Sequence, residues 1–389
     1  MDSSKEKIEI GKFLGSQPYN DSENYLNDPE ESVSVGEIKN FKDIQQTPYN
    51  LPVNFEWVSY DIDDPTQLDE IYALLKNHYV ENDDFRFHYS KEFLLWALKP
   101  PGYLQDWHLG VKMLGELIGF ISAIPVIISV NNNIIKMVEI NFLCVRKDIH
   151  NHRLTPVLIM EITRRANLIG IFQAVYTAGV TLPTPVAYCQ YYHRMLNPKK
   201  LIETNFFKMK NRMTMARTIK LYQLPTQTLT PGLRSLKDSD CASACRLLQN
   251  YLSKLDLHME FTIEEFRYWF YSKIVYCYVV EDSSNNITDL CSFYSLPSTI
   301  LNNSKYSTLN AAYSWYNVAT SVSLTQLMKD AIILANNTGF DVFNCLDVQN
   351  NKIFLNDLKF EPGNGYLKYY LYNRKTPQIN LDNIGIVLF

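Results

Sequence analysis

The most apolar stretch of the chain constrains its fold more than any other feature. Leu117 to Val130, LIGFISAIPVIISV, is a run of 14 residues that Pro125 interrupts. It is therefore shorter than the roughly 20 residues that a membrane-spanning helix needs. The pattern instead predicts two strands, LIGFISAI and VIISV, followed by a turn at 131–133 and a third strand, IIKMVEINFLCV. We expect a buried sheet in a protein without a membrane span.

Helical and strand patterns alternate in the first part of the chain, as is typical of an α/β fold. Regular structure is expected to start near Pro65, with helices over 65–80 and from the N-cap Ser90 to Lys99. The strand pattern WHLGVKML then precedes the apolar run. The predicted elements after it are a helix with Pro156 at its first position, a strand (172–180), a helix (186–196) and a strand (213–224).

The second part continues the alternation after a segment typical of a linker, PTQTLTPG (225–232). Its predicted helices and strands cover 238–254, 263–271, 274–282, 288–296, 309–318, 324–337, 340–348, a short helix after 350, and 366–373. The order strand, helix, Gly170, strand recurs as strand, helix, Gly339, strand. This favours a duplicated α/β unit, although two ordinary neighbouring βαβ units would give the same order.

Composition excludes several classes of protein. The formal net charge of −4 and the pI of about 6.0 argue against nucleic acid as the main partner. Seven cysteines without CxxC spacing indicate reduced thiols, and the first thirty residues contain no apolar signal region. We expect a soluble, cytoplasmic protein, and no feature requires more than a monomer. The 26 tyrosines and 20 phenylalanines exceed what packing alone needs.

The strongest chemical signal is a basic loop between a strand and a helix. The loop RKDIHNHRLT follows EINFLCV and contains Arg146, Lys147, His150, His152 and Arg153. Loop amides at a helix N-terminus, reinforced by the helix dipole, bind anions. Acyltransferases of the GNAT type hold the pyrophosphate of coenzyme A with such a strand, loop and helix. A solvated basic loop that merely caps the helix is the alternative.

Longer segments of the chain resemble one family. These are 85–102, 119–125, EINFLCV (139–145), 161–203, 292–300, 311–318, 339–347 and 369–373. In this order they are similar to the glycylpeptide N-tetradecanoyltransferases, or N-myristoyltransferases, and the chain resembles their catalytic core. The resemblance implies an α/β fold of two GNAT-like halves, related by pseudo-twofold symmetry around a saddle-shaped mixed sheet. It divides the chain into an arm (1–50) that partly contributes to the acyl-CoA site, a myristoyl-CoA-binding half (51–224) and a peptide-binding half (225–389).

The implied reaction transfers myristate from myristoyl-CoA to the α-amine of an N-terminal glycine. By resemblance, the backbone amides of Phe142 and Leu143 form the oxyanion hole, and the C-terminal carboxylate of Phe389 is the base. Asn141 and Thr177 would surround the glycine, and a close backbone approach is expected at Gly179. From the residues alone, Phe142 and Leu143 are equally typical of a buried strand, and the apolar end GIVLF of a frayed edge strand.

The resemblance also implies which residues bind the acyl-CoA. They are Phe13, Leu14, Phe142, Leu143, Cys144, Val145, Arg146, Lys147, His150, Asn151, His152, Arg153, Leu154, Thr155 and Pro156. The sequence departs from the usual family pattern in two respects: histidines replace basic residues in the loop, and Leu14 replaces an aromatic residue. Because histidine is largely neutral at pH 7, weaker or more pH-dependent affinity for coenzyme A is a hypothesis.

The implied peptide groove accounts for part of the aromatic surplus. Its residues are Tyr79, Asn82, Asp83, Asp84, Phe85, Phe87, Tyr89, Thr177, Gly179, Tyr191, His193, Ser298, Tyr313 and Gly365. An aromatic stripe packed in a core is the alternative for Phe85, Phe87 and Tyr89. Asn364 stands where many members have Asp, so a preference for basic residues along the peptide is in doubt.

No resident cofactor or metal is expected, and myristoyl-CoA acts as a co-substrate. Cys189 and His193 are four residues apart on a predicted helix, but two residues do not complete a metal site. The expected partners are myristoyl-CoA and peptides that begin with glycine. The alternatives are a GNAT-type acetyltransferase acting on lysine or other amines, and an acyl-CoA-binding module without catalysis.

Overall fold

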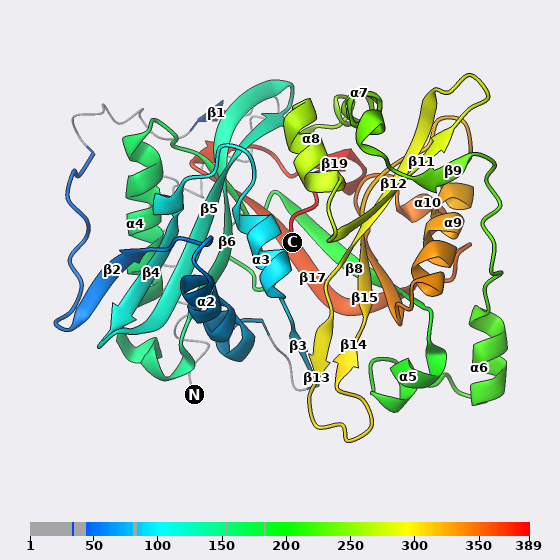
Figure 1. Cartoon of the computed structure of the whole chain (residues 1–389), viewed down its shortest axis with the longest axis horizontal. Coiled ribbons are helices and arrows are strands. Elements are labelled where there is room, and N and C mark those ends of the chain that lie inside the picture. The colour runs from blue at the N-terminus through cyan, green and yellow to red at the C-terminus, as the bar shows by residue number, and fades with distance from the viewer. Residues whose placement is uncertain (1–32, 35–43, 81–83, 153, 183) are drawn as a thin grey trace.

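The computed structural model describes residues 33–34, 44–80, 84–152, 154–182 and 184–389 (Figure 1). Of 33, 34 and 150–152 it describes the backbone only. Five residues expected at the site lie outside the described residues: Phe13, Leu14, Asn82, Asp83 and Arg153.

A large mixed sheet runs through the molecule. In spatial order its strands are β19 (Ile384–Gly385), β10 (Leu257–Met259), β5 (Glu116–Val130), β6 (Asn133–Val145), β7 (Ala174–Ala178), β17 (Glu361–Tyr372), β8 (Ala187–Met195), β16 (Val342–Leu346), β15 (Ala311–Val318), β12 (Ile287–Ser295), β11 (Val275–Glu281) and β9 (Leu233–Ser235). Strand β4 (His108–Met113) also pairs with β5, and β2 (Phe55–Ser59) pairs with β4. Regular structure is therefore present at β2 already, ahead of the expected start near Pro65.

Smaller sheets and helices complete the described chain. The small sheets join β1 (Val33–Ser34) to β18 (Arg374–Lys375), and β14 (Thr308–Leu309) to β13 (Ser298–Ile300) and β3 (Phe85–Phe87). The helices are α2 (Pro65–His78), α3 (Lys91–Leu98), η2 (Gln105–Trp107), η3 (Lys147–His152), α4 (Leu154–Leu168), α5 (Pro198–Glu203), α6 (Met215–Tyr222), η4 (Asp238–Asp240), α7 (Cys241–Leu252), α8 (Ile263–Phe270), α9 (Leu324–Asn337), α10 (Lys352–Leu355) and η5 (Leu381–Asn383). None of these helices is long and apolar enough to cross a membrane.

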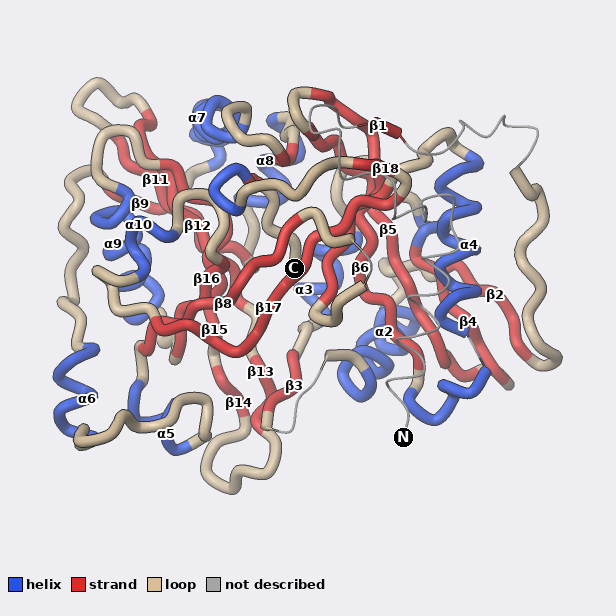
Figure 2. The backbone as a smooth tube through the Cα atoms, turned by 180° about the vertical axis from the view of Figure 1, so that it is seen from behind, coloured by secondary structure: helices blue, strands red, loops and turns tan. Residues whose placement is uncertain are grey.

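Helices cover both faces of the sheet, so its apolar strands are buried on two sides (Figures 1 and 2). In the first half, Leu154, Leu158 and Ile162 of α4 pack in one core cluster with Ile118 and Ile121 of β5. Helix α2 lies on the other face and packs in a second cluster that includes Phe120 and Ile124. In the second half α9 covers one face, and α7 and α8 cover the other.

The strand order is symmetric about its centre, the pair β17 and β8. Strands β4, β5 and β6, helix α4 and strand β7 correspond to β11, β12 and β15, helix α9 and strand β16. In both sets the helix connects two parallel strands, β6 to β7 and β15 to β16. The next strand then crosses over: β8 pairs with β16, and β17 pairs with β7. The predicted mixed α/β fold, with two related units, is confirmed.

The apolar run forms one strand, β5, and not the two strands predicted on either side of Pro125. Strand β4 pairs with β5 as far as Ser122, and β10 pairs with it from Ile128. Between those two partners β5 has an edge, and a proline is tolerated at the edge of a sheet. Helix α4 likewise begins at Leu154, ahead of the expected Pro156, because a first-turn proline lacks only an N–H that would have no intrahelical partner.

Two predicted elements were wrong. The segment predicted as a helix over 186–196 is strand β8, held between β16 and β17, because ladder pairing and aromatic residues outweigh its helix-like spacing. Cys189 and His193 are therefore about 13 Å apart along a strand and not on successive helical turns. The segment predicted as a strand over 213–224 contains helix α6, whose N-cap Thr214 accepts a hydrogen bond from the amide of Arg217.

Candidate active site

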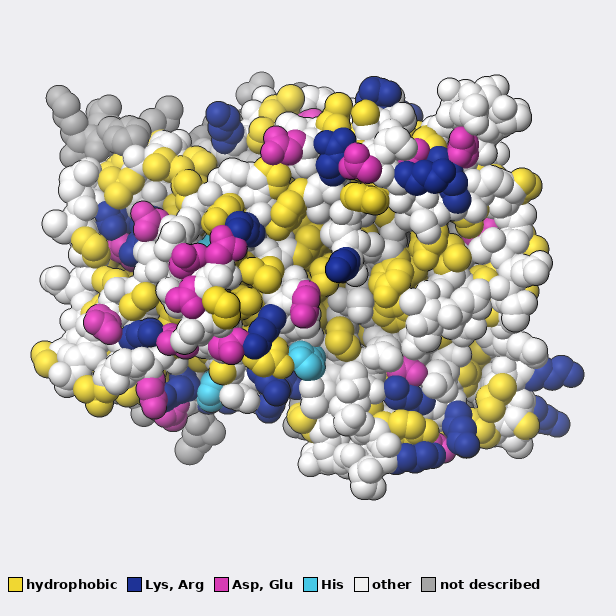
Figure 3. Space-filling view, in the orientation of Figure 1, with side chains coloured by type: hydrophobic (Ala, Val, Ile, Leu, Met, Phe, Trp, Pro, Cys, Tyr) yellow, Lys and Arg dark blue, Asp and Glu magenta, His cyan; other side chains and the backbone are white. Residues whose placement is uncertain are grey.

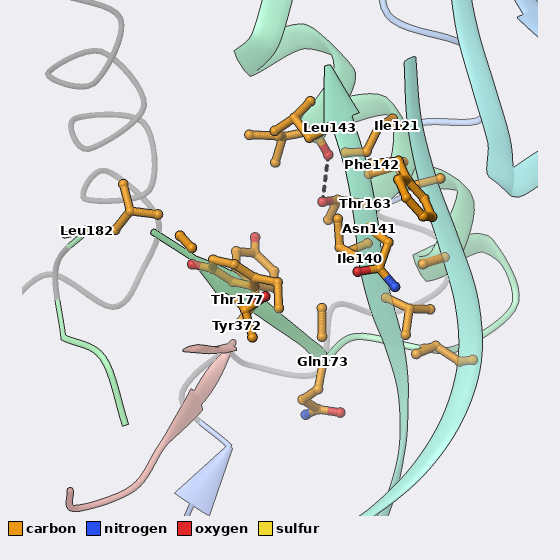
Figure 4. A pocket seen from close by; sticks show the side chains of 18 of the residues that line it. Ile121, Ile140, Asn141, Phe142, Leu143, Thr163, Gln173, Thr177, Leu182 and Tyr372 are labelled. Carbon is orange, nitrogen blue, oxygen red and sulfur yellow. Dashed lines mark hydrogen bonds between the residues drawn. The ribbon is translucent and has the colours of Figure 1, made fainter. Parts of the chain in front are cut away.

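The first half contains an apolar cavity where strands β6 and β7 separate. Their pairing is confined to Val138 with Ala174 and Glu139 with Val175. Beyond these pairs, the strands and helix α4 enclose a cavity of about 260 Å³ (Figure 4). Its apolar wall includes Ile140, Ile159, Ile162, Ala166, Ile171, Phe172, Val180 and Leu182. Such a wall suits a long hydrocarbon chain.

A β-bulge places two expected residues at this cavity. Phe120 pairs with Cys144 and Ser122 with Asn141, so the single residue Ile121 faces both Phe142 and Leu143. Phe142 has φ +55°, an uncommon conformation for a bulky residue. A bulge disrupts the ladder and turns backbone groups away from it. Both expected oxyanion residues line the cavity.

The hydroxyl of Tyr79 meets this bulge. Burial raises the pKa of Tyr79 well above its usual range, the Cys144 thiol adds to the rise, and a hydrogen bond from the Phe142 amide partly offsets it. Tyr79 is therefore neutral at physiological pH. The Phe142 amide thus donates to the Tyr79 oxygen and not to a strand partner, so a ligand oxygen would have to displace this bond to use the amide.

Asn141 and Thr177 lie on the two separating strands and both line the cavity (Figure 4). The amide nitrogen of Asn141 donates to the Glu139 carboxyl at 2.6 Å. Burial raises the pKa of Glu139 to about 7, and the hydrogen bond from Asn141 opposes the rise. Glu139 was not among the expected residues, although an acid inside the apolar strand pattern EINFLCV was a visible signal.

The C-terminal segment enters between the two halves, where Figure 1 marks the chain end. Ile386, Val387 and Leu388 are buried, and Phe389 lines the cavity. The Trp315 indole donates to the carbonyl of Val387 at 3.0 Å, and the Tyr369 hydroxyl donates to that of Ile386 at 3.0 Å. The terminus is held at the cavity and is not a frayed edge strand.

Most of the expected groove residues form one aromatic group beside the cavity. Phe87 pairs with Ser298 between β3 and β13, and its ring lies 6.1 Å from that of Tyr89 and 6.4 Å from that of Tyr313. Tyr191 lies 6.3 Å from Tyr313. Phe85 is further out, 5.3 Å from the ring of Phe206. The carbonyl of Asp84 accepts from Leu301, and a Cβ at Gly365 would have only an ordinary contact with Tyr191.

His193 is a half-buried, neutral member of this group. Its Nδ1 lies 2.7 Å from the amide oxygen of Asn344. Burial lowers the pKa of His193, and the bond to Asn344 opposes the decrease. A Cβ at Gly363 would come within 2.2 Å of the His193 ring, so this neighbour must be glycine. Within the described chain, no group of three His, Cys, Asp or Glu residues has metal-binding geometry.

The space beside Gly179 is open in the described chain, so the close approach of a substrate to its backbone stays a prediction. A Cβ there would meet none of the described atoms within 4 Å. Its carbonyl instead accepts a hydrogen bond from the ammonium of Lys368 at 2.5 Å. Lys368 is buried over the ring of Tyr188, and burial lowers its pKa. Lys368 was missed, although a lysine inside the aromatic pattern YLKYYLYN was a possible signal.

The basic loop is ordered by its own ion pairs. The Arg146 guanidinium donates to both oxygens of Asp148, at 2.8 and 2.9 Å, and to Glu116 at 2.8 Å. The amide of Lys147 donates to Nδ1 of His78 at 3.5 Å, and burial with the Lys147 charge lowers the pKa of His78. The loop continues as η3, and Leu154 and Thr155 are buried at the start of α4. These ion pairs of Arg146 hold the loop in place. The same carboxylates would compete with an anionic ligand for the charge of Arg146.

Comparison with known proteins decides the family. The model of the myristoyl-CoA:protein N-myristoyltransferase N-terminal domain matches residues 34–189, and that of the C-terminal domain matches residues 203–386. The chain belongs to the N-myristoyltransferase family. It is thus a transferase, and the family models divide it between 189 and 203, whereas the expected division is at 224.

Relatives and solved structures agree with this assignment over most of the chain. The N-myristoyltransferase described here is 52% identical to glycylpeptide N-tetradecanoyltransferase 1 of Arabidopsis thaliana, over 89% of this chain and 82% of that protein. It is 46% identical to the Plasmodium falciparum enzyme, over 99% and 95% of the two chains. A Saccharomyces cerevisiae N-myristoyltransferase with bound myristoyl-CoA superposes with a TM-score of 0.91 at 41% identity, over 97% of this chain and 94% of that one.

Proposed function

We propose that this N-myristoyltransferase transfers myristate from myristoyl-CoA to the α-amine of an N-terminal glycine. The observation that carries the proposal is a single cavity with three parts. An apolar wall leads to the bulge amides of Phe142 and Leu143, and the C-terminal residue Phe389 lines the same space. A yeast relative binds myristoyl-CoA in its solved structure. The buried, unpaired cysteines also suit a reducing compartment such as the cytoplasm.

The acyl chain occupies the apolar part of the cavity, against α4 and β7. Its thioester lies at the bulge, with the carbonyl oxygen directed toward the amides of Phe142 and Leu143. Each buried methylene contributes about 0.8 kcal/mol to binding, so the affinity for an acyl-CoA depends on the length of its acyl chain. The nucleotide part of the substrate extends to η3 and the N-terminal turn of α4, where loop amides and basic residues face its phosphates.

The reaction is a direct acyl transfer without a covalent enzyme intermediate. The glycine amine attacks the thioester carbon, negative charge develops on the carbonyl oxygen, and the thiolate of coenzyme A leaves. Donors aimed at that oxygen supply much of the rate, because removing one such donor typically costs about 100- to 1,000-fold. The bulge supports this role because it frees two successive amides from the ladder.

The amine must lose a proton before it attacks. We assign this step to the carboxylate at Phe389, which accepts the proton from the glycine ammonium. Asn141 and Thr177 hold the amine from opposite strands, and Gly179 follows Thr177 on the same segment. The remaining peptide follows the aromatic group of Tyr79, Phe85, Phe87, Tyr89, Tyr191 and Tyr313, with His193, Ser298, Asp84 and Gly365 beside it.

An added Gly-Ser dipeptide after Phe389 tests the base. It converts the carboxylate to an amide and moves the charge away from the cavity. We expect single-turnover transfer to a glycine-initiated peptide to fall by about 100-fold or more, within the range for general-base catalysis. Myristoyl-CoA binding, measured separately, should not change, and the same dipeptide added at Met1 is the control. Undiminished transfer with unchanged binding would exclude the carboxylate base.

Acetyl-CoA with a lysine peptide tests the alternative acetyltransferase. The large apolar cavity favours the longer acyl group, so we expect myristoyl-CoA to outcompete acetyl-CoA at equal concentration. Faster acetyl transfer to lysine than myristoyl transfer to glycine would favour the alternative.

A further inference from the structure

A second cavity lies in the other half of the molecule, away from the apolar one. It has a volume of about 470 Å³ and lies between Gln223–Pro225, the first turns of α9 and the turn after α10. Three basic residues line it: Arg194, Lys329 and Lys359. The acyl-transfer site does not use any of these residues, so this cavity needs its own explanation.

Arg194 is the unusual member of this group. It is only 3% exposed, and its Nε is buried without a hydrogen-bond partner in the described chain. Its terminal nitrogens donate to the backbone carbonyls of Met195 and Tyr222, and its guanidinium lies 4.8 Å from the Tyr222 ring centroid. No carboxylate of the described residues pairs with it. A buried cation without an anion is costly, and burial lowers the pKa of Arg194 to about 10.

Three lysines of the first half have carboxylate partners. Figure 3 shows acidic and basic side chains mixed over α2 and α3. There Lys91 contacts Asp69, Lys99 contacts Asp63, and Lys112 lies 2.8 Å from Glu70. Arg194 therefore lacks the carboxylate partner that these three lysines have. Arg194 is one of the residues that line the second cavity.

The N-terminus of α9 adds further donors at this cavity. Ser323 is the N-cap, and its hydroxyl accepts from the amide of Gln326. First-turn amides of a helix have no intrahelical acceptor, and the helix dipole favours an anion there. Ser323, Thr325 and Lys329 all line the cavity. This helix corresponds to α4, whose N-terminus follows the basic loop of the first half.

The acidic groups nearby leave room for an anion. Asp289 and Asp330 are already bound by backbone amides, those of Thr320 and Ser321 for the first, and those of Leu229 and Thr230 for the second. Asp357 is the one carboxylate among the residues lining the cavity. The three cations therefore exceed the acidic groups that face the same space.

We propose that this second cavity binds a small anion, a carboxylate or a phosphate group, between Arg194, Lys329 and the first turn of α9. Arginine suits both groups because its planar fork donates two hydrogen bonds to either. Lys359 also faces the cavity, although its ammonium donates to the carbonyl of Leu221 at 2.8 Å. The site lies on the half opposite to the acyl cavity, so it can be filled while myristoyl-CoA is bound.

Calorimetric titration of the full chain, saturated with myristoyl-CoA, tests the proposal. The probes are inorganic pyrophosphate and succinate, which represent the two sources of anion. We expect saturable binding of at least one probe to a single site. Lys329→Gln should weaken it by about tenfold, as expected for the loss of one charge-assisted contact. Lys273→Gln, an exposed lysine of the same half, is the matched control and should bind like the parent.

Two results would overturn the proposal. One is the absence of saturable heat with both probes, and the other is equal affinity of Lys329→Gln and the parent. Arg194→Gln provides a second variant, with circular dichroism to establish folding. If that variant does not fold, Lys329→Gln still decides the outcome, because Lys329 is partly exposed and not part of the core.

Discussion

The two halves contain the same β-bulge but use it differently. In the first half Phe120 and Ser122 of β5 pair with Cys144 and Asn141 of β6, and in the second Cys291 and Phe293 of β12 pair with Asn317 and Ser314 of β15. Ser292 therefore occupies the position of Ile121. In the second half the amide of Tyr316 donates to the Ser292 hydroxyl at 3.0 Å. The side chain of Ile121 has no oxygen atom, so the equivalent amide of Leu143 faces an apolar side chain.

The loop that follows differs in the same way. Before α9, the amides of Thr320, Ser321 and Val322 donate to the Asp289 carboxylate at 2.7, 2.9 and 3.3 Å. Ile118 occupies the position of Asp289 before α4. The second half has therefore filled these backbone donors with its own side chains, whereas the Ile121 and Ile118 side chains of the first half offer no acceptor at the corresponding positions. The comparison indicates that a duplicated unit becomes asymmetric through few polar substitutions.

The first prediction makes the first bulge like the second. Ile121→Ser should place a hydroxyl against the amides of Phe142 and Leu143, as Ser292 does at Tyr316. We expect kcat to fall by about 100-fold relative to Ile121→Ala, because one oxyanion donor is occupied. Ile121→Ala controls for the lost bulk, and steady-state kinetics provides the measurement. Equal kcat in the two variants would contradict the assignment of the bulge.

The second prediction concerns a variant that removes the Asp289 carboxylate from the loop before α9. Burial opposes ionisation of Asp289, but hydrogen bonds from Ser321, Thr288 and backbone amides hold its pKa below the usual range. Asp289→Ala leaves these buried donors unsatisfied, so we expect the free energy of unfolding to fall by about 3 kcal/mol. Urea unfolding measures the change, with Asp289→Asn as the milder control. A loss below about 1 kcal/mol would mean that water or another group replaces the carboxylate.

The third prediction concerns Glu139, whose place in the second half is taken by Ala312. The pKa of Glu139 in the folded state is about 7, above its usual value of 4.5. Between these pH values only the unfolded chain releases the proton, so stability should decrease as pH rises from 4.5 to 7 and then level off. Glu139→Gln should remove about 2 to 3 kcal/mol of this decrease. Unfolding curves measured at pH 5 and pH 8 test it, and identical pH dependence in both proteins would be the contrary result.

The smallest effect concerns the acyl chain. If only the first half holds the hydrocarbon, each methylene should contribute about 0.8 kcal/mol. Lauroyl-CoA, which is two methylenes shorter, should then show kcat/KM lower by about 15-fold. Competition between the two thioesters for one glycine peptide gives this ratio directly. A ratio near one would place the chain outside the apolar cavity.

Sequence reasoning predicted the elements whose signals are local. Ser90 caps α3 as expected, and its hydroxyl accepts from the amide of Phe93. The recurrence around Gly170 and Gly339 does mark two related units. The segment of strand β8 was predicted as a helix, and the segment of helix α6 as a strand. For β8, pairing with neighbouring strands and not local propensity decides the state of an aromatic segment.

The site was predictable only in part, for a similar reason. Resemblance pointed to Phe142 and Leu143, but a bulge is a property of register between β5 and β6, which one strand does not encode. The equivalence of Ser292 with Ile121 becomes visible only when both registers are known. Lys368 and Glu139 were visible as charges in apolar patterns, but their burial depends on distant strands.

Each of the two central strands, β8 and β17, pairs with a strand of the opposite half, and this crossover affects how the molecule folds. Thr177 on β7 pairs with Tyr369 on β17, and Tyr191 on β8 pairs with Leu346 on β16. A nascent chain that ends before β17 has no partner for one edge of β7, so the first half cannot complete its sheet during synthesis. Contacts between such distant segments slow folding. We therefore expect the two halves to fold as one cooperative unit, in which the apolar cavity is completed late.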